Sequence, residues 1–219
     1  MIPLRSSEPV YSRPVITSSL ITINIVIYFY QWTLSPYRFD QLVRTWGIVP
    51  DDLHAISLFT SMFLHASWLH VLGNMLFLWV FGRNLEDLIG GGRFLFFYVL
   101  CGLAAAVVQV IANLYSPAPT VGASGAIAGV MGAYLIKFPR TQIDTLFWFV
   151  LVIRLAIPAP FYLLLWFAMQ VLDSAFTGER SYTGGGVAYF AHIGGFIAGI
   201  LLIRLFPSRQ RWRHWYEES

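Results

Sequence analysis

The sequence predicts an all-α membrane protein, a bundle of six transmembrane helices with a long, membrane-associated first outer loop. Of its 219 residues, 57% are hydrophobic and only 11% are charged, whereas soluble domains carry about 25% charged residues. The mean hydropathy is +0.64. The chain therefore has too little polar surface to cover a water-soluble globule, and its apolar runs have the lengths of membrane spans.

Apolar runs close to the roughly 20 residues that cross a bilayer core occur six times along the chain. The short apolar segment 145–153 is followed by Arg154 and Pro158, which favours an interfacial or re-entrant segment over a seventh span. We expect a single domain over residues 1–219. The predicted spans are residues 15–34, 68–85, 93–115, 122–138, 157–176 and 187–206.

The basic residues predict that both chain ends lie in the cytoplasm. With this orientation eleven Lys and Arg residues face the cytoplasm and three face outside, which is the bias of the positive-inside rule. The second, fourth and sixth spans then run from outside to inside. A compact chain of this kind suggests an integral, multi-pass protein of a prokaryotic plasma membrane. The cytoplasmic group is Arg5, Arg13, Arg83, Arg93, Lys137, Arg140, Arg154, Arg204, Arg209, Arg211 and Arg213, and the outer group is Arg38, Arg44 and Arg180.

Two outer loops have distinct compositions. Residues 35–67 mix charged residues with many aromatic and aliphatic ones, which favours packing on the membrane surface over free solvation. Residues 177–186, TGERSYTGGG, end in three glycines with large backbone freedom. We expect this second loop to be a mobile lid.

Four polar side chains lie near the outer ends of the inward-running spans. They are His70 and Asn74 on the second span, Ser124 on the fourth and His192 on the sixth. A helix rises ~1.5 Å per residue, so all four are expected at a similar, shallow depth. Polar groups in lipid are costly and need a partner or a function.

Small residues at four-residue spacing predict close contact between the fourth and sixth spans. His192 shares a helix face with the small residues of its own span, so this contact would bring it toward Ser124. A serine hydroxyl becomes a useful nucleophile when a neutral imidazole takes its proton. The expected packing residues are Gly122, Gly125 and Gly129 on the fourth span and Gly195 and Gly199 on the sixth.

His70 and Asn74 lie four residues apart, on one helix face, where two donors could bind the oxyanion of a tetrahedral intermediate. Structural explanations remain for each residue. The His70–Asn74 pair could be an interhelical hydrogen-bond clamp, and Ser124 could bond the carbonyl four residues back. Structural roles are also favoured for His54 and His65.

Other chemistries fit less well. No HExxH motif is present, and His65 and His70 are poorly spaced for one metal ion. Asp173 is the lone candidate acid and lies near the outer end of the fifth span, where an interfacial position is expected, so a two-carboxylate site is not expected. The basic and aromatic run RQRWRHW suits a membrane interface better than nucleic acid. We therefore expect no metal, no cofactor and no nucleic-acid partner.

Three motifs in this order resemble the rhomboid family of intramembrane serine proteases: HASWLHVLGN, GASG and AHIGGFIAG. The resemblance implies a dyad of Ser124 as nucleophile and His192 as general base, without a carboxylate. It implies an oxyanion hole made of His70, Asn74 and the Ser124 backbone amide. The implied partners are the lipid bilayer and membrane proteins with a single helix, cut at or just inside the outer boundary.

The same resemblance assigns other positions. Gly195 and Gly199 match close-packing positions, Glu86 matches a structural acid, and residues 177–186 match a cap over a water-filled site. Two positions depart from the family pattern: AISLF stands where many members have a Trp-Arg pair, and Ala128 stands where many have an aromatic beneath the histidine.

The sequence therefore predicts an intramembrane serine endopeptidase. The alternatives are a non-catalytic protein of the same kind that binds membrane helices, or a small transporter or channel. The transporter is less favoured because no charged pathway crosses the midplane.

Overall fold

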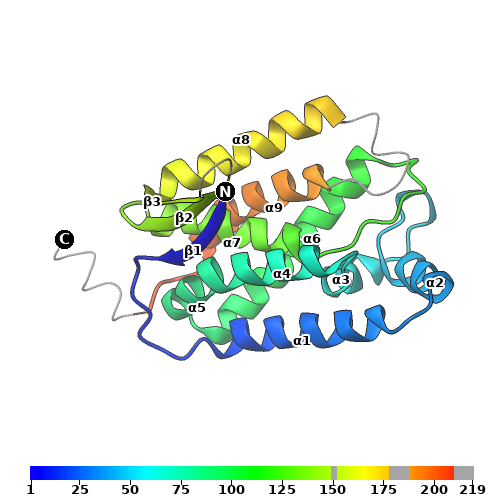
Figure 1. The fold of residues 1–219 in the computed structure, drawn as a ribbon, viewed down its shortest axis with the longest axis horizontal. Helices are drawn as coiled ribbons and strands as arrows, with labels where there is room; N and C mark the ends of the chain where they lie inside the picture. Colours follow the sequence, from blue (N-terminus) through cyan, green and yellow to red (C-terminus); the bar gives the residue numbers. More distant parts are fainter. Residues whose placement is uncertain (149–151, 178–187, 210–219) are drawn as a thin grey trace.

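The computed structural model describes residues 1–148, 152–177 and 188–209. Its main body is a bundle of roughly aligned helices, with α1 and α8 along opposite sides (Figure 1). The bundle helices are α1 (Val15–Trp32), α4 (Trp68–Phe77), α5 (Arg83–Ile89), α6 (Gly91–Ala112), α7 (Ser124–Lys137), α8 (Ala159–Thr177) and α9 (Tyr189–Leu202). A π-helical turn, η3 (Leu78–Gly82), joins α4 to α5, and a 3-10 turn, η5 (Ile203–Leu205), follows α9.

Two helices in the described part are long and apolar enough to cross a bilayer, Val15–Trp32 and Gly91–Ala112. A third span is added if the pair Ser57–Phe63 and Trp68–Ile89, bent by 94°, is taken as one. The stretches Ser124–Lys137, Ala159–Asp173 and Tyr189–Leu205 are apolar but shorter. The helical membrane bundle agrees with the predicted fold class, while the count of six spans and the single domain stay predictions.

Helix α7 lies at the centre of the bundle. Its residues Gly125 to Tyr134 are all buried, and it packs against both α6 and α9. A Cβ built on Gly195 or Gly199 of α9 would collide with the carbonyl oxygen of Gly125 or Gly129 of α7, respectively. The two helix backbones therefore touch directly, as small residues permit in membrane proteins.

The amino end of α1 is held by a carboxylate from another helix. The backbone N–H groups of Ile16 and Thr17 donate to Glu86 of α5 at 2.9 and 2.7 Å. The first N–H groups of a helix lack intrahelical partners, and a negative charge there is favourable. Asp87 accepts from the N–H groups of Tyr11 and Ser12. The acids after the second predicted span thus tie the entry of α1 to α5.

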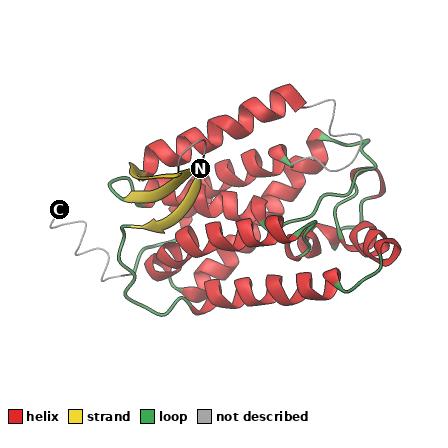
Figure 2. Cartoon of the chain, viewed as in Figure 1, coloured by secondary structure: helices red, strands yellow, loops and turns green. Residues whose placement is uncertain are grey.

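A three-stranded antiparallel sheet lies at one end of the bundle (Figure 2). Its order is β1 (Ile2–Ser6), β2 (Gln142–Trp148) and β3 (Val152–Pro158), with Ile2 opposite Leu146 and Gln142 opposite Pro158. The sheet was not predicted: where the structure describes the segment 145–153, it forms parts of β2 and β3. Its interfacial placement stays a prediction. Its β-branched and aromatic residues favour strands, and β1 supplies a partner that hydropathy does not reveal.

Charged side chains connect the three strands. Arg154 of β3 donates to Asp144 of β2 at 2.7 Å, and Arg5 of β1 donates to the same carboxylate at 3.0 Å. The hydrogen bond from Arg154, supported by Arg5, holds the pKa of Asp144 below its usual value. The ionised carboxylate therefore links both outer strands to the central one.

The first predicted outer loop contains four short helical pieces. They are α2 (Pro36–Trp46), η1 (Pro50–Asp52), α3 (Ser57–Thr60) and η2 (Ser61–Phe63), and α2 lies at the opposite end of the bundle from the sheet (Figure 1). Ile48 and Thr120 exchange two backbone hydrogen bonds, and the Gly122 N–H donates to the Ser61 carbonyl at 2.9 Å. This loop is therefore fixed to the segment that leads into α7. The predicted lid, 177–186, lies almost wholly outside the described residues.

Candidate active site

A cavity of about 490 Å³ lies between α4, α6, α7 and α9. Ser124, His192, His70 and Asn74 all line it. The four side chains that the sequence placed at a common depth are therefore brought to one site. Gln109 of α6 and Asn113, the residue after this helix, add further amide groups to its wall.

Ser124 is the first residue of α7, and the chain reaches it through Gly122. Gly122 has a φ of +131°, a conformation that favours glycine. A Cβ there would lie 2.9 Å from the His70 ring and 3.7 Å from Asn74 Nδ2. Gly122 thus allows the backbone to pass close to both side chains just before Ser124. The sequence predicted Gly122 as a packing residue between α7 and α9, whereas the structure places it at this site.

His70 and Asn74 each offer a donor toward this backbone. The Ala66 N–H donates to His70 Nδ1 at 3.4 Å, so the ring proton is on Nε2, the atom nearer Gly122. Asn74 Nδ2 is buried and has no hydrogen-bond partner within the described residues. A buried donor without a partner costs about 1–3 kcal/mol. Such a donor is suited to binding an acceptor oxygen of a ligand in the cavity.

The backbone N–H of Ser124 lies among the first N–H groups of α7, which have no intrahelical acceptor. Helix amino ends attract negative charge because these N–H groups and the helix dipole act together. The site therefore combines one hydroxyl with three N–H donors of different origin. This arrangement could bind an anionic oxygen next to the hydroxyl.

His192 is buried on α9 and is held by two side chains of α8. Its Nδ1 lies 2.6 Å from Gln170 Oε1, and its ring lies 5.7 Å from the Trp166 ring, inclined by 37°. His192 and Ser124 line the same cavity, but no hydrogen bond joins them in the described structure. Hydrogen bonds between reacting groups are often long before substrate binds.

Sequence reasoning missed both α8 residues. Gln170 had a signal, because it is a polar side chain inside an apolar predicted span and needs a partner there. Trp166 had none, since aromatic residues are common in such spans. Ala128, the position where many rhomboids have an aromatic, is buried on α7, and the ring beside His192 comes from α8 instead.

The remaining histidines lie beside the site or away from it. His65 is fully buried, with its ring 5.0 Å from that of His70, and its backbone N–H donates to Gln31. His54 is exposed, 3.9 Å from Asp52. Among the described residues no group of three or more His, Cys, Asp or Glu side chains could hold a metal ion.

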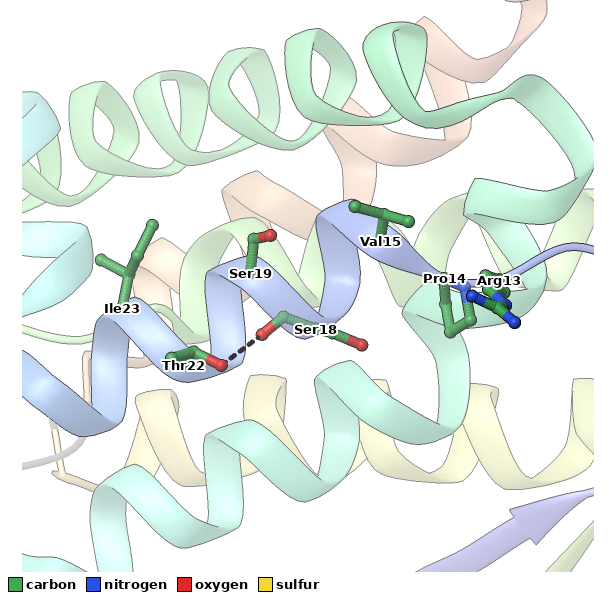
Figure 3. Close-up of a pocket in the computed structure, with 7 residues that line it drawn as sticks. All are labelled: Arg13, Pro14, Val15, Ser18, Ser19, Thr22 and Ile23. Atoms are coloured by element: carbon green, nitrogen blue, oxygen red, sulfur yellow. Dashed lines mark hydrogen bonds between the residues drawn. The ribbon is translucent and has the colours of Figure 1, made fainter.

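A second hollow runs along the outer face of α1 (Figure 3). It is a shallow groove of about 590 Å³ lined by seven residues, among them Arg13, Ser18 and Ser19. Thr22 Oγ1 donates to the Ser18 carbonyl within the helix. The lining contains hydroxyls but no imidazole to activate them, so the cavity of Ser124 is the better candidate site.

Comparisons with known proteins agree with the motifs. The Rhomboid domain family model matches residues 52–209. The chain is 32% identical over 190 residues to Rhomboid protein 1, mitochondrial, of Saccharomyces cerevisiae, covering 84% of this chain and 51% of that protein. It is 31% identical over 127 residues to Rhomboid protease GluP of Bacillus subtilis, covering 56% and 24%. It is 30% identical over 172 residues to RHOMBOID-like protein 6, mitochondrial, of Arabidopsis thaliana, covering 74% and 48%.

The chain therefore belongs to the rhomboid family and is an integral membrane protein. It spans about half or less of the length of these relatives. The relatives include bacterial and mitochondrial proteins, so a prokaryotic plasma membrane stays a prediction.

Proposed function

We propose that the protein is a serine endopeptidase that cleaves single-span membrane proteins at or near the outer boundary of the membrane. One observation carries the proposal: Ser124 shares a cavity with His192 and with the unpartnered donor of Asn74. Membership of a family that includes a named protease supports it.

In this proposal His192 Nε2 takes the hydroxyl proton of Ser124 as the oxygen attacks a peptide carbonyl. Asn74 Nδ2, His70 Nε2 and the Ser124 N–H donate to the resulting oxyanion. The protonated imidazole then gives its proton to the leaving amine, which leaves an acyl-enzyme. Water entering the cavity resolves this intermediate. In the orientation that the basic residues predict, with both chain ends in the cytoplasm, the cavity faces outside.

A serine-directed fluorophosphonate tests this function directly. We expect labelling of the wild-type protein at Ser124, which peptide mass spectrometry identifies. Ser124→Ala is expected to remove the label. Ser19→Ala is the matched control, because that hydroxyl lies in the groove of α1 away from the cavity, and it is expected to label fully. A folded wild-type protein that does not label would favour the non-catalytic alternative, a protein that binds membrane helices.

A further inference from the structure

Within the described structure the His192 ring makes a hydrogen bond to one side chain, and that side chain is an uncharged amide. Gln170 Oε1 lies 2.6 Å from His192 Nδ1, and both residues are buried. An amide oxygen only accepts hydrogen bonds, so this contact is a hydrogen bond in the tautomer with the proton on His192 Nδ1. A neutral imidazole has one ring proton, and Nε2 is therefore free to accept.

The ring contact with Trp166 comes from the same helix. Trp166 and Gln170 are four residues apart on α8 and therefore share a face. Their contacts with His192 have different effects: the amide selects the tautomer, and the indole limits the tilt of the ring. Helix α8 therefore supplies both constraints.

We propose that Gln170 is a positioning residue that holds His192 with Nδ1 protonated and Nε2 available to the Ser124 hydroxyl, an inference that rests on the proposed function. Gln170 takes the place that a carboxylate has in a Ser-His-Asp triad, without placing a charge in a buried site. An ionised carboxylate there would need its own partners, whereas an amide costs far less to bury. The neutral acceptor orients the imidazole and stabilises its protonated form only weakly.

Other titratable groups near His192 come from three elements. His70 of α4 lines the same cavity. Tyr189 precedes His192 by one turn of α9, and Asp173 follows Gln170 by one turn of α8, where the two interact electrostatically. These groups are unchanged in variants of Gln170, so differences among such variants report the Gln170–His192 contact.

The test compares Gln170→Met with Gln170→Glu in purified full-length protein, using one substrate in liposomes. Methionine has a similar length but no acceptor, and we expect kcat to fall about 10- to 100-fold with KM little changed. The acid limb of the kcat/KM profile should move to lower pH. Gln170→Glu keeps the acceptor and should retain more of kcat than Gln170→Met. Its negative charge favours the imidazolium, so its acid limb should move to higher pH.

Met169→Leu is the matched control, because Met169 is the exposed neighbour of Gln170 on α8. It should leave kcat and the pH profile unchanged. Opposite pH shifts in the two Gln170 variants are not expected from a loss of packing alone. Unchanged kcat and an unchanged acid limb in Gln170→Met would overturn the inference.

A second measurement does not depend on turnover. In ¹⁵N-histidine-labelled Ser124→Ala protein, NMR should find His192 protonated at Nδ1, and Gln170→Met should produce a mixture of tautomers. Protonation at Nε2 in the Ser124→Ala protein would overturn the inference even if wild-type protein cleaves substrate. If the wild-type protein neither cleaves nor labels, the proposed function fails, and the tautomer still decides the role of Gln170.

Discussion

Gly195 of α9 lies directly against the carbonyl oxygen of Gly125 of α7. Gly125 follows Ser124, and Gly195 lies three residues after His192. This backbone contact therefore sets the spacing between the two side chains in the cavity. A methyl group at Gly195 would have to displace backbone atoms, which cannot move as a flexible side chain can.

Gly195→Ala is accordingly expected to separate α7 from α9. Overpacking of a tight core typically costs roughly 1–3 kcal/mol, and the free energy of unfolding should fall by this order. The rate of cleavage should fall even where the variant is still folded, because small displacements of the reacting groups slow the reaction strongly. Gly73→Ala is the control, since a Cβ at Gly73 would meet nothing within 4 Å. Equal activity of the two variants would contradict the role of this contact.

Ser124→Ala and His192→Ala are each expected to abolish cleavage while the protein still inserts into the membrane. In the proposed mechanism the first change removes the nucleophile, and the second removes the group that takes its proton. Turnover of a fluorescent membrane substrate in liposomes measures the loss, and thermal unfolding verifies the fold. Wild-type-like cleavage by either variant would rule out the dyad.

Asn74→Ala is expected to lower kcat by about 10²- to 10³-fold, with a small effect on KM. The unpartnered amide would donate to the oxyanion, which exists only along the reaction path. His70→Ala should act in the same direction. Steady-state kinetics separate the two constants, and a change confined to KM would argue instead for a role in binding the substrate.

Glu86→Gln is expected to lower the free energy of unfolding by about 1–2 kcal/mol. The carboxylate accepts the free N–H groups of Ile16 and Thr17, and hydrogen bonds to charged groups contribute about 1.5–3 kcal/mol each. Glutamine keeps one acceptor oxygen and loses the charge. Denaturation in detergent measures the change, and kcat well below the unfolding temperature should stay the same. A variant as stable as the wild type would exclude this capping role.

Asp144→Asn is expected to remove a pH-dependent part of the stability. The pKa of Asp144 is lower in the folded protein than in the unfolded chain, chiefly because Arg154 donates to the ionised carboxylate. Its contribution is complete above the unfolded-state pKa, about 3.9, and is lost as the pH falls through the lower folded-state pKa. The difference in Tm between wild type and variant should therefore be constant near neutral pH and shrink in acid. A difference that grows in acid would contradict this sign.

The sequence predicted four of the residues that line the cavity, but it did not predict the α8 residues that contact His192. Alternation of span direction placed His70, Asn74, Ser124 and His192 at one depth without any knowledge of their neighbours. The roles of these residues stay predictions. Gln170 could have been noticed as a polar group within an apolar span, but its partner could not be named, because spacing along one helix does not say which helix faces it.

The three-stranded sheet was not predicted from the sequence, for a different reason. Hydropathy counts apolar side chains, and residues 145–153 are as apolar as a short buried helix. The pairing of β1 with β2 joins residues far apart in the chain, such as Arg5 and Asp144, which are 139 positions apart. No local pattern records such a pairing.

That separation has a consequence for biogenesis. Strand β1 is synthesised well before β2, with α1 through α7 made in between. During this interval the first residues have no strand to pair with, and closing so long a loop is entropically costly and slow. Strand β1 can therefore pair with β2 only after α7 has been translated. Formation of the sheet is thus a late step in the assembly of the protein.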